Sequence, residues 1–301
     1  MITAEVIQRS AHIGTNNELV TFVLKYPRFI HSEFMTHRCF SRNAASSRAV
    51  PVHKFIEAVR TDPATPEYWG SNKPGMQAGE ELVAEDLDWA KQAWYKAGIE
   101  MTESAQQLVD IGCHKQIANR TIEPFLHITV IATTGKRGLD NFFALRANKM
   151  AQPEFQVLAY RMLDAYMKAQ TAILEPGEWH IPFSRPEERD LIVAKQLAAA
   201  TGRIARVSYL KHDGAKSTTE EDIELHDKLM SSGHWSPFEH CAMAMDSRQR
   251  FGRMAALGKG VSTTGSNLGP GWLQYRKTFE DMPKQVDLVK LAAEKPDWIT
   301  L

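Results

Sequence analysis

Apolar residues recur at helical spacing in three stretches of the chain. The longest covers residues 80–112, where Leu87 and Trp94 belong to a repeating apolar stripe. A second covers 153–174 and begins at a proline, a residue favoured in the first turn of a helix. A third, 219–233, ends at a glycine, which commonly terminates helices. The pattern therefore predicts three amphipathic helices.

β-branched and aromatic residues dominate two other stretches. Residues 18–38 open in this way and are typical of a strand, whereas the apolar residues that follow Pro27 have a spacing closer to that of a helix. Residues 125–134 are consistent with a strand or a buried helix. Residues 51–78 contain several prolines and glycines, which indicates loop with one short helix.

A stretch rich in proline and charge, residues 175–190, is a candidate boundary. It separates a segment 1–175 from a segment 190–301, which form either one composite domain or two paired halves. Within the second segment, residues 258–272 are rich in glycine, serine and threonine. They lack the spacing of a phosphate-binding P-loop, so we expect a linker or a mobile lid there.

Composition narrows the class of protein. Of the 301 residues, 43% are apolar and 24% are charged, as in an ordinary globular protein. Lysine plus arginine equals aspartate plus glutamate at 36 each, which argues against nucleic acid as a partner but allows a local basic pocket. Three cysteines without a CxxC pair suggest a reducing compartment. The sequence contains no run of about 18 apolar residues, the length that would indicate a membrane span. We expect a soluble, cytoplasmic protein.

The segment HRCFSRNAASSR, residues 37–48, concentrates polar chemistry in a short space. Its arginines can bind carboxylate or phosphate through two parallel hydrogen bonds, and its serines can complete such a site. On spacing alone, an anion-binding wall and a solvated, salt-bridged loop are equally good interpretations. Cys39 has cationic neighbours that favour a thiolate, but an inert, partly buried thiol is the more common case.

Three further clusters carry polar residues among apolar ones: 137–146, 205–209 and 233–240. In the first, Arg146 ends an apolar helix, where it could extend to solvent or point into a cleft. In the last, Ser236 and the proline after it are typical of a turn or helix start, which can bind an anion. Its histidines and glutamate lack HExxH spacing, so we expect no metal site.

Together these clusters resemble the flavin-dependent thymidylate synthases, whose motif has the form RHRxxSxNExSxR. Residues 36–48 match it at His37, Arg38, Ser41, Asn43, Ser46 and Arg48. Residues 137–155 and 119–124 resemble later parts of the family, and ARVSY and GHWSPFEH resemble its amino-terminal segments. Because the last two follow the motif here, the chain resembles a permuted member, or one whose halves pair between subunits.

The resemblance implies an α+β fold with a central sheet flanked by helices, and a homo-oligomer, with a tetramer favoured and active sites between subunits. It implies reductive methylation of dUMP to dTMP, with FAD as cofactor and methylenetetrahydrofolate and NADPH as co-substrates. Two alternatives stay open. One is a related flavoenzyme that modifies C5 of another pyrimidine nucleotide, such as dCMP, or that hydroxymethylates. The other is a nucleotide-binding homologue without turnover.

Roles for individual residues follow from the resemblance alone. The residues expected to border FAD are His37, Arg38, Arg137, Asn141, Ser208, His234, Ser236 and Glu239. Those expected to bind the nucleotide are Glu33, Ser46, Ser47, Arg48, Arg120 and Arg146. Catalysis is assigned to Arg146, which would stabilise negative charge developing on the pyrimidine, and to Ser46 as a positioning hydroxyl.

Three positions depart from the family motif. Thr36 replaces its first arginine, Ala44 replaces its glutamate, and Glu33 replaces a glutamine that usually precedes it. Losing both a cation and a carboxylate costs less than losing one of them, because neither charge is left unpaired. Arg42 and Arg276 are candidates for a substitute cation.

Overall fold

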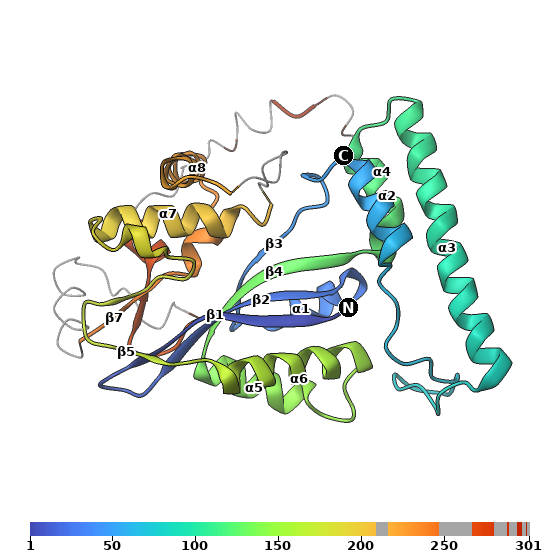
Figure 1. Ribbon diagram of the computed structural model, residues 1–301, viewed down its shortest axis with the longest axis horizontal. Helices are drawn as coiled ribbons and strands as arrows, with labels where there is room; N and C mark the ends of the chain where they lie inside the picture. Colours follow the sequence, from blue (N-terminus) through green and yellow to red (C-terminus); the bar gives the residue numbers. More distant parts are fainter. Residues whose placement is uncertain (209–215, 247–266, 280–287, 289–293, 297–298, 300–301) are drawn as a thin grey trace.

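The computed structural model describes the chain except for residues 209–215, 247–266, 280–287, 289–293, 297–298 and 300–301 (Figure 1). Residues 258–266 of the predicted linker or lid therefore lie outside the described residues. No helix in the described part is long and apolar enough to cross a membrane.

A five-stranded sheet forms the centre of the molecule, in the order β3-β4-β2-β1-β5. Strands β1 (Thr3–His12) and β2 (Glu18–Pro27) pair antiparallel, as do β2 and β4 (His127–Gly135). The short β3 (Ser41–Ala44) adds to the outer edge of β4, and β5 (Ala172–Leu174) runs parallel to β1. The sheet brings the motif at residues 37–48 to one edge.

Alternation along β2 gives the sheet two buried faces. Phe22 and Leu24 point into a core with helices α5 (Lys136–Arg146) and α6 (Pro153–Lys168), which lie below the sheet in Figure 1. Val23, on the opposite face, packs with the second core, to which the carboxyl-terminal segment contributes. One sheet is thus covered on both sides by parts of the chain far apart in sequence.

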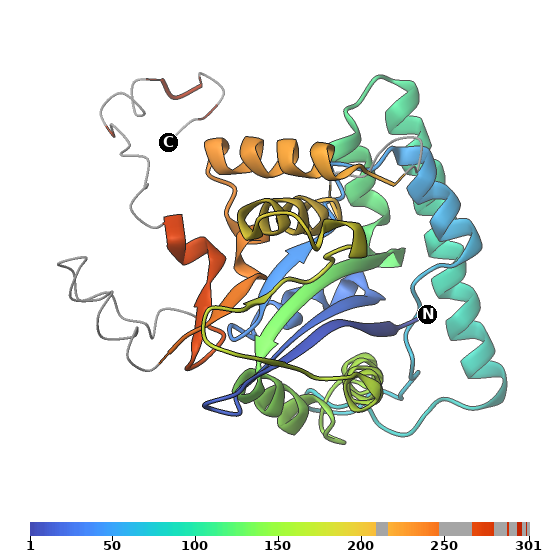
Figure 2. The same cartoon turned by 60° about the vertical axis from the view of Figure 1, so that its left-hand side comes forward.

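The carboxyl-terminal segment covers the second face. Helices α7 (Val193–Ala205) and α8 (Thr219–Ser232) pack against each other above the sheet (Figure 1). Beside them lies a three-stranded sheet of β6 (Trp179–His180), β7 (Ala242–Ala244) and β8 (Trp272–Gln274). Figure 2 shows this second sheet next to the central one.

A buried histidine network joins the two parts; it consists of Ser10, Thr21, Thr133, His180 and His240. The ring of His180 lies 2.8 Å from Ser10 Oγ and 2.9 Å from Thr21 Oγ1. Thr21 and Thr133 are hydrogen-bonded at 2.7 Å, and Thr133 Oγ1 lies 2.8 Å from His240 Nδ1. Burial lowers the pKa of each histidine to about 3, so both rings are neutral at ordinary pH.

Three helices form a separate arm at the right of Figure 1: α2 (Val52–Thr61), α3 (Ala84–Asp110) and α4 (Lys115–Ile122). Their small core includes Ile56, Val59 and Ile122. Short helical turns connect the larger elements: η1 (Arg28–Ile30), α1 (His31–Phe34), η2 (Glu123–Phe125), η3 (Pro186–Glu188), η4 (Ser236–Glu239) and η6 (Tyr275–Phe279).

Most predicted elements are confirmed, and the fold is the expected α+β class with a central sheet flanked by helices. The prediction of a helix over 153–174 is wrong in its last part. The helix stops at Lys168 because Ala169 adopts an extended conformation, and residues 172–174 pair with β1. The helical spacing after Pro27 yields only short turns that end at Phe34.

Candidate functional site

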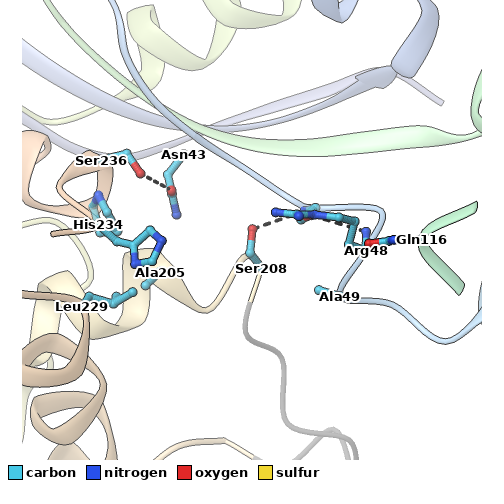
Figure 3. Close-up of a pocket in the computed structure, with 11 residues that line it drawn as sticks. Asn43, Arg48, Ala49, Gln116, Ala205, Ser208, Leu229, His234 and Ser236 are labelled. Carbon is cyan, nitrogen blue, oxygen red and sulfur yellow. Dashed lines mark hydrogen bonds between the residues drawn. The ribbon is translucent and has the colours of Figure 1, made fainter. Parts of the chain in front are cut away.

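The motif segment and the carboxyl-terminal segment enclose a pocket of about 410 Å³, here called the junction pocket (Figure 3). From the motif side come Asn43, Ser46, Arg48 and Ala49, and from α4 comes Gln116. From the carboxyl-terminal side come Ala205, Ser208, Leu229, His234, Ser236 and Pro237. The pocket therefore contains parts of three clusters that stand out in the sequence.

Hydrogen bonds hold the two sides of the junction pocket together. The Ser208 hydroxyl donates to the Ala44 carbonyl at 2.7 Å and accepts from the Ser46 backbone N–H at 3.2 Å. Ser236 Oγ donates to Asn43 Oδ1 at 3.1 Å, while Asn43 Nδ2 donates to the Ile204 carbonyl at 2.8 Å. The end of β3 is thus fixed by residues more than 150 positions later in the chain.

Helix α4 fixes the loop that carries Arg48. Asn119 Nδ2 donates to the carbonyls of Ser47 at 2.6 Å and Val50 at 3.0 Å, and Lys115 Nζ donates to the Ala49 carbonyl at 3.1 Å. Ser47 is buried, so it supports the loop through its backbone. The Arg48 side chain is exposed and makes no ion pair with the described residues. It is therefore a cation held at the rim of the pocket.

A second pair of predicted residues lies apart from this pocket. His37 is buried among the rings of Phe34, Phe142 and Phe155, and Arg146 Nε donates to its Nε2 at 2.8 Å. Burial, together with the guanidinium groups of Arg146 and Arg42, lowers the pKa of His37 to about 4. The neutral ring can therefore accept this hydrogen bond.

Arg146 is also held from its other side. Its guanidinium lies over the Phe155 ring, 4.4 Å from the centroid, in a cation–π contact. Of the two interpretations of Arg146, extension into solvent is not what the structure shows, since the side chain is half-buried, and it does not line the junction pocket. It is folded back against His37 and Phe155, with the direction of its charge fixed.

A second pocket, of about 330 Å³, is here called the arginine pocket. Its lining contains Arg38, Phe40, Arg42, Glu239, Asn267, Gln274, Arg276 and Lys277. Two residues expected near FAD, Arg38 and Glu239, are in it. Thr36 lies outside both lining sets, and its hydroxyl donates to the Glu33 carbonyl at 2.6 Å.

The remaining predicted residues line neither pocket in the described chain. Arg137 and Asn141 are exposed on α5. Arg120 is largely exposed and forms an ion pair with Glu123 at 3.6 Å. Glu33 accepts a hydrogen bond from Ser32 Oγ at 2.8 Å. Their assignment to FAD or nucleotide stays a prediction.

Two glutamines are among the lining residues that the sequence reasoning missed. Gln116 precedes the 119–124 segment by three positions, and nothing in its own type marks it as a ligand. Gln274 is buried and hydrogen-bonds Ser41 Oγ at 3.0 Å and the Glu239 carbonyl at 2.9 Å. The sequence offers one signal for it: the stretch GWLQYRKTF, residues 271–279, resembles a degenerate copy of the family's segment around the motif.

Comparison with solved structures finds distant likenesses. A UMP/dUMP methylase PolB from Streptomyces cacaoi bound with 5-Br UMP superposes with a TM-score of 0.46 and 20% identity, over 56% of this chain and 89% of that one. The same enzyme bound with 5-Br dUMP gives 0.46 and 19%, over 56% and 91%.

Comparison of the sequence is more informative. A flavin-dependent thymidylate synthase from Pseudothermotoga lettingae is 27% identical over 164 residues, which are 54% of this chain and 68% of the relative. The family model described as "Thymidylate synthase complementing protein", Thy1, matches residues 14–170, just over half of the chain. This region contains the whole motif at 36–48. The resemblance is confirmed: the chain belongs to the Thy1 family, that of the flavin-dependent thymidylate synthases.

Proposed function

We propose that the protein methylates C5 of the pyrimidine of dUMP to give dTMP. FAD would be the cofactor, and methylenetetrahydrofolate and NADPH the co-substrates. The observation that carries the proposal is the junction pocket. There the motif residues Ser46 and Arg48 lie beside Ser208, His234 and Ser236 of the carboxyl-terminal segment. Family membership supports the same reaction class.

The junction pocket suits a nucleotide. Arg48 at the rim can pair with phosphate through two parallel hydrogen bonds, and α4 holds its loop in place. The hydroxyl of Ser46 and the amide of Gln116 also line the pocket. Such groups can fix the orientation of a base or sugar by hydrogen bonds, while the volume is within the range of small-molecule sites.

The same surroundings fit a flavin. Hydroxyl, amide and imidazole groups of Ser236, Asn43 and His234 match the alternating donors and acceptors on the edge of a flavin ring, and Arg38 in the neighbouring pocket suits its phosphates. A bound flavin supplies the hydride chemistry that amino-acid side chains lack. The protein's contribution is to bind and orient, and in this proposal His234, Ser236 and Arg38 do so.

Arg146 contributes the electrostatic part of the proposal. A guanidinium that is already oriented can stabilise negative charge on the pyrimidine without reorganising during the reaction. His37 and Phe155 provide that orientation. Since Arg146, Arg137 and Asn141 all lie on α5 and line neither pocket of their own chain, we propose that α5 completes the site of another copy in a homo-oligomer, such as a tetramer.

Product analysis tests the reaction. The purified protein should be yellow or bind added FAD, and with dUMP, methylenetetrahydrofolate and NADPH it should form dTMP, seen by mass spectrometry. A colourless protein that binds no FAD, or a flavoprotein that forms no dTMP, would overturn the proposal. A hydroxymethylated product, or turnover of dCMP in place of dUMP, would identify a related pyrimidine-modifying activity.

Mixing of variants tests the shared site. Arg48→Gln and Arg146→Gln should each be nearly inactive alone. Co-expressed with different tags and isolated as mixed oligomers, they should regain activity, because one site in the mixture receives both native arginines. Mixed oligomers that stay inactive would show that both side chains serve the site within one chain.

A further inference from the structure

His234 lines the junction pocket, and one of its two ring nitrogens is engaged within the chain. Its Nδ1 lies 2.8 Å from Oγ of Ser232, the last residue of α8. Gly233 between them has a φ of 77°, a left-handed conformation that turns the chain back toward the end of the helix. The backbone N–H of His234 donates to the Leu229 carbonyl at 2.9 Å. The end of α8 therefore holds the ring at the pocket wall (Figure 3).

The hydroxyl of Ser232 determines which ring nitrogen carries the proton. Ser232 Oγ lies 2.9 Å from the Lys228 carbonyl and 3.1 Å from the Leu229 carbonyl, and both of these groups can only accept. A hydroxyl has a single hydrogen, and only that hydrogen makes a contact with a carbonyl oxygen attractive. Ser232 therefore donates to the helix end and accepts from the Nδ1–H of His234. In the neutral ring this leaves Nε2 without a hydrogen, as an acceptor.

That acceptor is available to a ligand. The His234 side chain is exposed at the pocket, and its Nε2 has no hydrogen-bond partner among the described residues. The neighbouring hydroxyls add lone pairs, because their hydrogens are used within the chain. Ser236 donates to Asn43 Oδ1 at 3.1 Å, and Ser208 donates to the Ala44 carbonyl at 2.7 Å. This part of the wall presents acceptors, so a ligand that binds there must offer a donor.

We propose that Ser232 is a positioning residue that makes His234 an acceptor for an imide N–H, the N–H that lies between two carbonyl groups. Both ligands of the proposed function carry one: uracil in dUMP at N3, and the flavin ring also at N3. Cytosine has a lone pair and no hydrogen at its N3, so the same approach would place two acceptors against each other. The inference rests on the proposed function for its ligands and adds a rule of selection. Where the imide is that of uracil, this contact excludes dCMP.

Methylation of N3 removes the hydrogen in question and tests the contact by calorimetry. The flavin-loaded protein is titrated with dUMP and N3-methyl-dUMP, and the protein freed of flavin is titrated with FAD and N3-methyl-FAD. We expect the methylated form of one pair to bind about tenfold more weakly or worse, as for the loss of one hydrogen bond. Sensitivity in the dUMP pair identifies uracil as the partner of His234, and sensitivity in the FAD pair identifies the flavin.

Three variants separate the role of Ser232 from packing. Ser232→Ala keeps the ring and releases its other tautomer, so the preference for the unmethylated ligand should fall several-fold, whereas Ser232→Thr retains a hydroxyl and should keep the preference. Since the ring is unchanged in Ser232→Ala, a purely steric effect of the methyl group would persist there. The matched control is Ser231→Ala. Ser231 Oγ also donates to the Lys228 carbonyl, at 2.9 Å, without contacting His234, so the full preference should remain.

Three results would count against the inference, and they are distinguishable. An equal preference in the native chain, Ser232→Ala and Ser231→Ala would show that Ser232 does not act through His234. Equal binding of the methylated and unmethylated forms in both pairs would overturn the imide contact and leave the proposed function intact. A native chain that binds neither dUMP nor FAD would overturn the proposed function, and this inference with it.

Discussion

The carboxyl-terminal segment contacts the central sheet through two groups of polar residues, the buried histidine network and the junction pocket. The two differ in burial and in how completely their polar atoms are hydrogen-bonded. In the buried histidine network, His180 uses both ring nitrogens on hydroxyls of β1 and β2, and both histidines are fully buried. In the junction pocket, His234, Ser236 and Arg48 are exposed at a cavity. One contact is closed and almost completely hydrogen-bonded; the other is open and presents its polar groups outward.

This difference distinguishes polar contacts that stabilise the fold from polar groups that can bind a ligand. Buried polar groups that satisfy one another stabilise one arrangement of two segments and offer nothing to a ligand. The network has one exception, His240 Nε2, which is without a partner in the described part of the chain. Polar groups around an open pocket contribute less to holding the segments together, but they can bind a ligand because some of their donors and acceptors are still available. We infer that the network fixes the geometry that the junction pocket needs.

Acid should have the largest effect, and it should act on the closed contact. The pKa values of His180 and His240, in this contact, are about 3, and those of His37 and His127, outside it, are about 4, all below the ordinary value near 6.5. The unfolded chain therefore binds more protons than the folded one between these values. Stability is fully present above pH 6.5 and falls as pH drops toward 3, by about 1.4 kcal/mol per pH unit for each histidine at most.

Denaturant unfolding at a series of pH values between 7 and 4 measures this effect. The slope should shrink in His180→Gln, which removes one titrating group and retains hydrogen-bonding capacity. Equal stability at pH 7 and pH 5 would show that the two rings are not held neutral in the folded chain.

Truncation of His180 is the next largest perturbation. His180→Ala removes two hydrogen bonds, leaves the hydroxyls of Ser10 and Thr21 without this partner and creates a cavity. We expect a loss of about 3 kcal/mol in the free energy of unfolding. The matched change in the open contact, Ser236→Ala, should cost less than about 1 kcal/mol, because water can replace its bond to Asn43. Similar losses in both variants would abolish the distinction between the two contacts.

Removal of the rim charge should affect binding alone. Arg48→Gln should weaken dUMP binding by roughly 2 kcal/mol, within the range for a hydrogen bond to a charged group, with unchanged thermal stability. Arg60→Gln, an exposed arginine of α2 that lines neither pocket, is the control and should bind dUMP normally. Calorimetry on both variants gives the comparison. Unaltered dUMP affinity in Arg48→Gln would remove Arg48 from the site.

The smallest effect is expected for the pair of His37 and Arg146, which belongs neither to the histidine network nor to the junction pocket. In His37→Phe, Arg146 loses its acceptor but keeps its cation–π contact with Phe155. We expect kcat to fall about tenfold, or about 1.4 kcal/mol, with KM for dUMP nearly unchanged. His37→Gln, whose side-chain oxygen can accept from Arg146, should recover part of the rate. Equal loss in both variants would mean that His37 does not act by orienting Arg146.

Local patterns predicted the long elements well. The helical spacing of residues 84–110 and the β-branched residues of β2 are sufficient to predict their conformation. The pattern of residues 125–134 is consistent with a strand or a buried helix, and pairing with β2 makes this stretch the strand β4. The strand β1 was not predicted, because its sequence TAEVIQRSAH mixes polar and apolar residues. It forms a strand through pairing with β2. β3 escaped for a similar reason: Ser41 and Asn43 are polar but buried, because distant residues satisfy them.

The site was predictable in its parts and not in its assembly. The resemblance to the family singles out Ser46, Arg48, Ser208 and Ser236 within the motif and the carboxyl-terminal clusters, and the structure brings these four together. Nothing local indicates that His37 would be buried beside Arg146, since that contact depends on how α5 packs on the motif. The convergence of Arg42 with Arg276 likewise requires the fold.

A crystal structure of the protein with dUMP bound tests the central claim most directly. The account predicts the nucleotide in the junction pocket, with its phosphate within hydrogen-bond distance of Arg48 and its sugar or base contacting Ser46. A nucleotide bound elsewhere, with Arg48 left in solvent and the junction pocket empty, would contradict it.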